Sequence, residues 1–195
     1  PLDRAYGRAF WEEESARAGL PTVGTFVPHP PPNALLLLPI AAGLDPVAAK
    51  TVWSCVLALL LLASFFELRH VVRPQAWPWL VGLALLTQTA SLRNALLYGQ
   101  PYPLLLLLLC SSLVALVRGK SLESGLLLAP VVALKLYGLP FVLFYAASRR
   151  WRAVMGVLAG VAAVTAVSVV VLGPEIHRAY VSQVLRESLD GRILD

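Results

Sequence analysis

Long apolar blocks separated by short polar segments make up most of the chain. Residues 46–68, 77–91, 102–117, 125–148 and 153–172 are almost entirely apolar. A helix rises about 1.5 Å per residue and the hydrocarbon of a bilayer is about 30 Å thick, so one span needs about 20 such residues. The pattern predicts an all-α, polytopic bundle of membrane-spanning helices, the first of them capped by Asp45 and begun by Pro46.

The block at 125–148 is interrupted by Lys135, Gly138 and Pro140. Lysines and arginines favour the cytoplasmic side of a membrane, and they cluster after residues 68 and 117 and before residue 153. If all three clusters are cytoplasmic, the block must go out and return, turning near residues 136–140. We therefore expect a broken pair of short helices. The alternative is one straight helix from Ser121 to Ser148, which would place the arginines at 149–152 outside.

This topology divides the chain into three parts. Residues 1–45 form an outer-side segment with short helices and a proline-rich loop, residues 46–172 form the helical bundle, and residues 173–195 form an outer amphipathic helix at the interface. The apolar positions of that last helix are Ile176, Tyr180, Val181, Val184 and Leu185. We expect a single domain that is incomplete at both ends, because the chain starts at Pro1 and has only one methionine.

Composition supports the membrane interpretation. Hydrophobic residues make up 58% of the chain and charged residues 14%, whereas soluble domains carry about 45–50% and about 25%. This excludes a soluble globular domain, a disordered chain and a basic nucleic-acid-binding domain, despite a net charge of +5. The cysteines and histidines lack metal-site spacing, so no metal ligand or cofactor is assigned and any metal requirement stays open.

The loop at residues 93–103 concentrates polar side chains between two apolar blocks: Arg93, Asn94, Tyr98, Gln100 and Tyr102. Gly99 permits unusual backbone angles, and Pro101 and Pro103 stiffen the exit. Such a rigid group of hydrogen-bonding side chains suits a sugar or a phosphate. The alternative is an ordinary connection whose polar groups meet water.

Lys135 is a cation inside an apolar block, next to Tyr137. An ammonium there is costly unless it is paired or hydrated, so it suggests a phosphate contact in a cavity. The alternative is a side chain that extends to the headgroups. His29, in a stiff proline-rich segment, could bond a pyrophosphate or sugar, or could simply be solvated.

Seven segments, in this order and spacing, resemble bacterial glycosyltransferase family 87, of the GT-C superfamily, formerly a domain of unknown function. They are Phe26–Pro32, Leu38–Ile40, Ala48–Trp53, Asn94–Tyr102, Leu134–Phe141, Arg149–Ala153 and Gln183–Asp195. The resemblance implies a GT-C fold and an inverting hexosyltransferase. Such enzymes transfer a sugar, often mannose, from a polyprenyl phosphate to a lipid or glycan acceptor on the outer face of the bacterial cytoplasmic membrane.

For such an enzyme, the polar residues described above would take the following roles. Lys135 and Arg93 would bind the donor phosphate, and the sugar or acceptor pocket would be lined by His29, Asn94, Tyr98, Gln100, Tyr102 and Tyr137. The catalytic base of such enzymes is an aspartate in the first outer loop. It is expected upstream of Pro1, with Asp3 as a weak candidate within the chain. The expected partners are the lipid-linked donor, the acceptor and membrane lipids, with no nucleic acid.

Two functions from other classes compete with this hypothesis. A transporter or flippase subunit would use Lys135 in its pathway, and it should show a second polar break in a corresponding half of the chain. The sequence has no such second break. A non-catalytic membrane scaffold would need no pocket.

Overall fold

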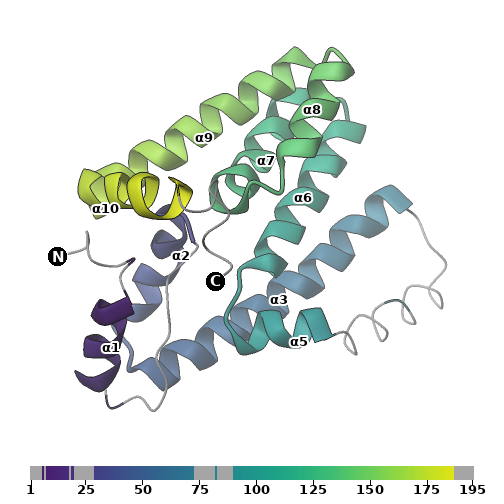
Figure 1. Cartoon of the computed structure of the whole chain (residues 1–195). Coiled ribbons are helices and arrows are strands. Elements are labelled where there is room, and N and C mark those ends of the chain that lie inside the picture. Colours follow the sequence, from purple (N-terminus) through teal and green to yellow (C-terminus); the bar gives the residue numbers. More distant parts are fainter. Residues whose placement is uncertain are drawn as a thin grey trace. The chain divides into compact units, whose positions relative to one another are not determined.

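The computed structural model describes Tyr6, residues 8–17, Gly19, residues 29–72, Gly82 and residues 90–186. This part of the chain is helical and contains no strand. The elements are α1 (Arg8–Arg17), α2 (Pro32–Ala41), α3 (Pro46–Val72), α5 (Ala90–Leu97), α6 (Tyr102–Val117), α7 (Ser121–Lys135), α8 (Leu139–Ala147), α9 (Trp151–Leu172), α10 (Pro174–Ala179) and the π-helical turn η2 (Tyr180–Leu185) (Figure 1). The helical class predicted from the sequence is confirmed. Most of the predicted span at 77–91 lies outside the described residues.

Among the described residues, two helices are long and apolar enough to cross a membrane, Pro46–His70 and Trp151–Leu172. The first begins where the sequence predicts. The Asp45 carboxylate accepts hydrogen bonds from the backbone N–H groups of Val47 and Ala48, at 3.0 and 3.1 Å. The helix α6 has 16 residues and is about 24 Å long. A polytopic membrane bundle beyond the two long helices stays a prediction.

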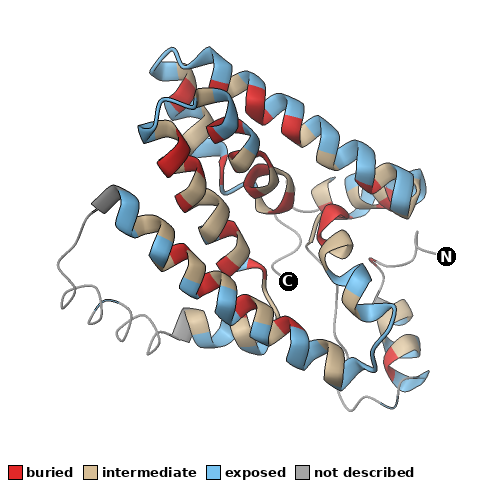
Figure 2. Ribbon diagram, turned by 180° about the vertical axis from the view of Figure 1, so that it is seen from behind, coloured by how far each residue is buried: buried red, intermediate tan, exposed pale blue. Residues whose placement is uncertain are grey.

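The chain divides into two compact units, residues 37–162 and residues 1–36 with 163–195. In the larger unit α6 packs along both α3 and α7. The outer surfaces of α3 and α9 are largely exposed or half-buried (Figure 2), and only 22% and 17% of their apolar windows are buried. Such apolar, uncovered surfaces are what lipid-facing helices present.

The segment 121–148 is a hairpin of two helices. Leu136 ends α7 in the left-handed backbone conformation, with φ 54°, and α8 returns until the Tyr145 hydroxyl lies 2.7 Å from the Ser124 hydroxyl. A Cβ atom on Gly138 would lie 2.5 Å from Val132 Cγ2, so a larger residue where the chain doubles back would require the Val132 side chain to shift. The broken pair is confirmed, and the single straight helix is wrong.

The first half of α9 packs closely against α7. A Cβ atom on Gly156 would lie 2.5 Å from the Leu122 carbonyl oxygen, and one on Gly160 would clash with the Ala129 Cβ. The Gly156–Gly160 pair has the spacing that lets two helices approach closely. Here it serves packing within one chain.

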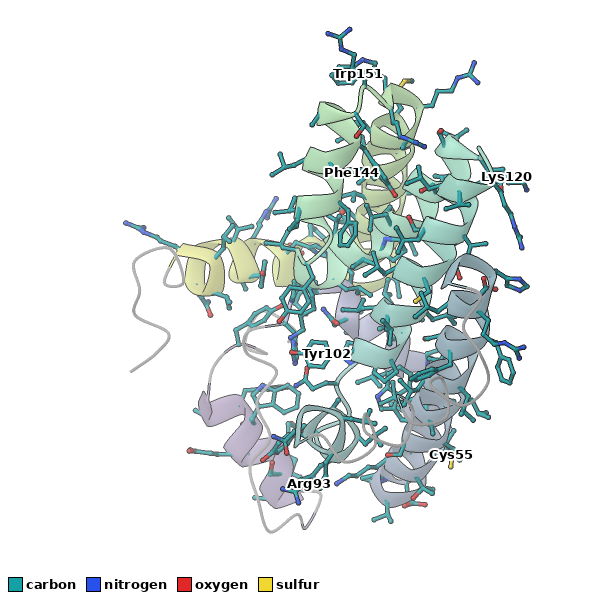
Figure 3. All side chains as sticks on the ribbon, turned by 90° about the vertical axis from the view of Figure 1, so that its right-hand side faces the viewer. Cys55, Arg93, Tyr102, Lys120, Phe144 and Trp151 are labelled. Carbon is teal, nitrogen blue, oxygen red and sulfur yellow. The ribbon has the colours of Figure 1, made fainter. Side chains whose placement is uncertain are left out.

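The two basic turns, at residues 118–120 and 149–152, lie away from the loop that carries Arg93. Lys120 and Trp151 lie at one end of the larger unit, and Tyr102 and Arg93 lie at the other (Figure 3). The hairpin explains this arrangement, because α8 brings Arg150 back to the level at which α7 began. The structure therefore separates the basic turns from the loop and the lysine that the sequence places on the opposite side.

The smaller unit is built around the end of the chain. Its core contains Tyr6, Ile176, Ala179 and Val184. The predicted helix begins at Pro174 as expected, and of its apolar positions Ile176 and Val184 lie in the core while Val181 is exposed. The turn η2 follows i→i+5 spacing, so Val184 lies beneath Ala179, and Val181 is 56% exposed. The placement of this helix at the membrane interface stays a prediction.

Candidate functional site

A lysine and two tyrosines meet at the end of the hairpin. Lys135 is the last residue of α7, and its Nζ lies 5.4 Å from the centroid of the Tyr102 ring. The Tyr102 ring also stacks on Tyr137, with centroids 6.0 Å apart and planes inclined by 10°. In the part of the chain that the structure describes, no carboxylate pairs with Lys135. The ammonium faces an aromatic π-system, an arrangement that attracts a cation weakly and leaves its charge free for a ligand.

Local backbone signals place these three side chains. The left-handed residue Leu136 stops α7 directly after Lys135, and Tyr137 stands in the turn before α8. Tyr102 is the first residue of α6, with Pro103 at the second position, where a proline costs no helical hydrogen bond. The antiparallel packing of α6 and α7 then brings the start of one helix beside the end of the other.

The loop before α6 is held by a tryptophan of α3. The Trp53 indole N–H donates a hydrogen bond of 2.8 Å to the Gly99 carbonyl oxygen, and Trp53 is only 8% exposed. Gly99 has φ +64°, and a Cβ atom there would lie 3.2 Å from the Trp53 ring. Sequence reasoning missed this contact. Its only signal is an indole N–H inside an apolar helix, which needs an acceptor.

A second missed feature lies inside the bundle. The hydroxyl of Tyr145 is 2.9 Å from that of Ser112 and 2.7 Å from that of Ser124, and the Ser112 hydroxyl donates to the Ser124 carbonyl oxygen at 2.8 Å. All three side chains are at most 1% exposed. These hydrogen bonds tie α6, α7 and α8 together and so fix the position of the turn that carries Tyr137.

The remaining predicted site residues are more scattered. Arg93 and Asn94 lie on α5 with exposed side chains, and Tyr98 is 71% exposed. Gln100 follows them with a half-buried side chain. The structure thus brings together Lys135, Tyr102 and Tyr137, and it places the other loop residues near the same end of the larger unit (Figure 3).

Two predicted residues cannot be assigned to that end. His29 belongs to the smaller unit, where its carbonyl oxygen accepts a hydrogen bond of 3.0 Å from the Tyr6 hydroxyl. Asp3 lies outside the described residues. The roles predicted for His29 and Asp3 stay predictions.

The smaller unit contains its own polar contacts. Both ring nitrogens of His177 are engaged, one with the Gly173 carbonyl oxygen at 2.9 Å and the other with the buried Ser168 hydroxyl at 3.0 Å. Burial raises the pKa of Tyr6 above its usual value, and the neighbouring Tyr180 adds to this shift. Within the described residues no group of three or more His, Cys, Asp or Glu side chains could hold a metal ion.

The model of glycosyltransferase family 87 matches residues 26–192. The chain belongs to glycosyltransferase family 87. No curated protein and no solved structure matches it significantly. The resemblance seen in the sequence is confirmed, and glycosyl transfer is the class of activity that membership of family 87 implies for this chain.

Proposed function

We propose that this family 87 chain is part of an integral membrane enzyme that transfers a mannose-like sugar from a polyprenyl-phosphate donor. The acceptor is a lipid or a glycan on the outer face of the bacterial cytoplasmic membrane. The observation that carries the proposal is Lys135, a half-buried cation at the end of an apolar helix that faces Tyr102. In the described part of the chain it has no carboxylate partner. An anionic ligand would supply the missing counter-charge.

The reaction breaks the bond between the anomeric carbon and the phosphate oxygen of the donor. The acceptor oxygen attacks the anomeric carbon from the opposite face, and the bonding electron pair leaves with the phosphate oxygen. Lys135, with Arg93 as a second cation, stabilises the negative charge that develops on that oxygen. The proton of the acceptor hydroxyl goes to a general base.

The surroundings of Lys135 suit such a donor. The stacked rings of Tyr102 and Tyr137 offer an apolar surface with hydroxyl groups at its edge. The side chains of Asn94 and Gln100 add hydrogen-bonding groups from the loop that Trp53 holds. The exposed apolar surface of α3 suits the polyprenyl tail.

The test measures transfer of labelled mannose from polyprenyl-phosphate mannose by membranes that contain the full-length protein. We expect Lys135→Met to lose roughly 30- to 1000-fold in rate, corresponding to a lost phosphate contact of about 2–4 kcal/mol. Lys135→Arg should keep part of the activity because the charge persists. The matched control is Lys50→Met, at an exposed lysine near the start of α3, which should transfer at the wild-type rate.

Wild-type rates for Lys135→Met at normal protein levels would refute the phosphate contact. They would leave Lys135 as a side chain that reaches the headgroups. If the wild-type protein moves the lipid-linked sugar across the membrane but transfers none of it, the flippase alternative would replace the transferase.

A further inference from the structure

A patch of exposed cations lies at the end of the larger unit opposite Lys135. We call it the basic patch; its members are Arg118, Lys120, Arg149, Arg150 and Arg152. They come from the turn after α6, the turn after α8 and the first turn of α9. Figure 3 shows Lys120 and Trp151 in the upper half of the view, with Tyr102 and Arg93 below them. The basic patch has no part in the proposed transfer reaction.

Helix packing brings these segments together. The helix α7 begins directly after Lys120, and the first turns of α9 press against it. A Cβ atom on Gly156 would lie 2.5 Å from the Leu122 carbonyl oxygen, and one on Gly125 would clash with the backbone of Ala153. Arg152 is therefore one residue away from the close contact between Ala153 and Gly125 of α7.

The charge of the basic patch is poorly balanced. Glu123 is the acidic residue of these segments, and both of its oxygens bond to the Lys120 ammonium, at 3.1 and 2.9 Å. No acidic partner is found for the four arginines of the patch among the residues that the structure describes. The start of α7, which has no side-chain cap, adds partial positive charge. The patch thus has a surplus of positive charge available to an anion.

Exposed apolar side chains border the basic patch. They are Val117, Leu122, Phe144, Trp151 and Met155, each at least 50% exposed. A nucleic acid or an acidic peptide would use the charges and leave these apolar groups in water. A phospholipid would use both, because its phosphate reaches the cations while its acyl chains cover the apolar border. Trp151 stands at the boundary, as tryptophans do at membrane interfaces.

We propose that the basic patch binds the headgroups of anionic phospholipids and so anchors the start of α7 and α9 at one membrane surface. The proposal rests on the membrane placement given above, but not on the identity of the sugar donor. Each arginine or lysine near an anionic lipid surface strengthens binding by about fivefold. Removing two members of the patch should therefore weaken the preference for anionic lipid by more than tenfold.

The experiment compares the purified chain in nanodiscs of phosphatidylcholine alone and of phosphatidylcholine with phosphatidylglycerol in equal parts. A fluorescent phosphatidylglycerol reports binding, and helix content is checked by circular dichroism. We expect Arg150→Gln/Arg152→Gln to lose more than tenfold in binding. Arg150→Lys/Arg152→Lys should keep it, since the charge persists. The matched control is Lys50→Gln, an exposed lysine on α3 outside the patch, which should bind like wild type.

Several results would overturn the proposal. One is binding at the wild-type level by the glutamine variant. Another is loss of binding by the lysine variant at normal helix content. A third is a loss in Lys50→Gln as large as that in the glutamine variant. Complete competition by inorganic phosphate or by a short single-stranded DNA would show that the patch recognises charge and not a lipid. A chain that does not insert into nanodiscs would refute the membrane placement itself. An inserted chain without lipid preference would refute this inference and leave the transfer reaction untouched.

Discussion

The close contact between α7 and α9 can be tested by moving one methyl group from one helix to the other by mutation. A Cβ atom on Gly160 would clash with the Cβ of Ala129, a residue with no exposed surface. Gly160→Ala gains about 1 kcal/mol of helix propensity. Overpacking costs about 1–3 kcal/mol, so the net loss of stability should be about 0–2 kcal/mol. Ala129→Gly loses about 1 kcal/mol of propensity.

The double variant Gly160→Ala/Ala129→Gly removes the clash, because the methyl group has only changed helices. The gain and the loss of propensity then cancel, so the double variant should be about as stable as wild type. For Gly156→Ala no second substitution can remove the clash, because the added methyl group would meet a backbone atom. The Leu122 carbonyl oxygen would lie 2.5 Å away, well inside the 3.4 Å at which ordinary contact begins. We expect Gly156→Ala to lose about 1–2 kcal/mol.

The assay is thermal unfolding of the purified chain in detergent, followed by circular dichroism. For a chain of this size 1 kcal/mol corresponds to about 2–4 °C in the midpoint. The control is Gly43→Ala, because a Cβ atom on Gly43 would meet no atom within 4 Å. The reasoning is refuted if Gly156→Ala unfolds at the same temperature as the control. The reasoning is also refuted if the stability loss of the double variant equals the sum of the losses of the two single variants. Residues in contact should couple, so the double variant should lose less than that sum.

Three further predictions concern polar contacts. Trp53→Phe keeps the apolar ring but removes the donor to the Gly99 carbonyl oxygen; it should cost about 1 kcal/mol and raise KM for the sugar donor more than it lowers kcat. Equal effects on both would contradict a positioning role. Tyr145→Phe removes two hydrogen bonds between helices, worth on average about 0.6 kcal/mol each in a bilayer; it should lower the thermal midpoint, and an unchanged midpoint would show that the hydroxyls contribute nothing. Burial and Tyr180 raise the pKa of Tyr6 above 10.0, so the fold requires the neutral phenol: stability should be full below about pH 10 and decline above it, measured by unfolding at increasing pH, and Tyr6→Phe should decline less.

The sequence alone predicts those features that depend on residues close to one another along the chain. The cap at Asp45, the helical class and the turn near Gly138 follow from local chemistry: a side-chain acceptor before a helix, long apolar blocks, and residues that interrupt them. The Gly156–Gly160 spacing indicates a close helix contact, and the structure adds that the partner is α7. The family, too, is visible in the order of short motifs.

Local pattern fails where the helix changes its period. The spacing of apolar residues after Pro174 predicts a regular amphipathic helix, but the structure has an i→i+5 turn at Tyr180–Leu185. Packing against the core around Tyr6 favours this register. The regular helix period that the apolar spacing predicts is therefore not kept at Tyr180–Leu185.

Only the tertiary structure decides which distant residues meet. Lys135 and Tyr102 stand 33 residues apart, and Trp53 and Gly99 stand 46 apart. Their contacts depend on how α3, α6 and α7 slide and rotate against one another. On an apolar helix surface, several packing positions of a neighbouring helix have nearly the same free energy. The close contacts of glycines, the hydroxyl cluster at Tyr145 and the indole hydrogen bond of Trp53 favour one of them. Burial makes each unsatisfied polar group costly, so these few polar contacts select one arrangement that the apolar pattern leaves open.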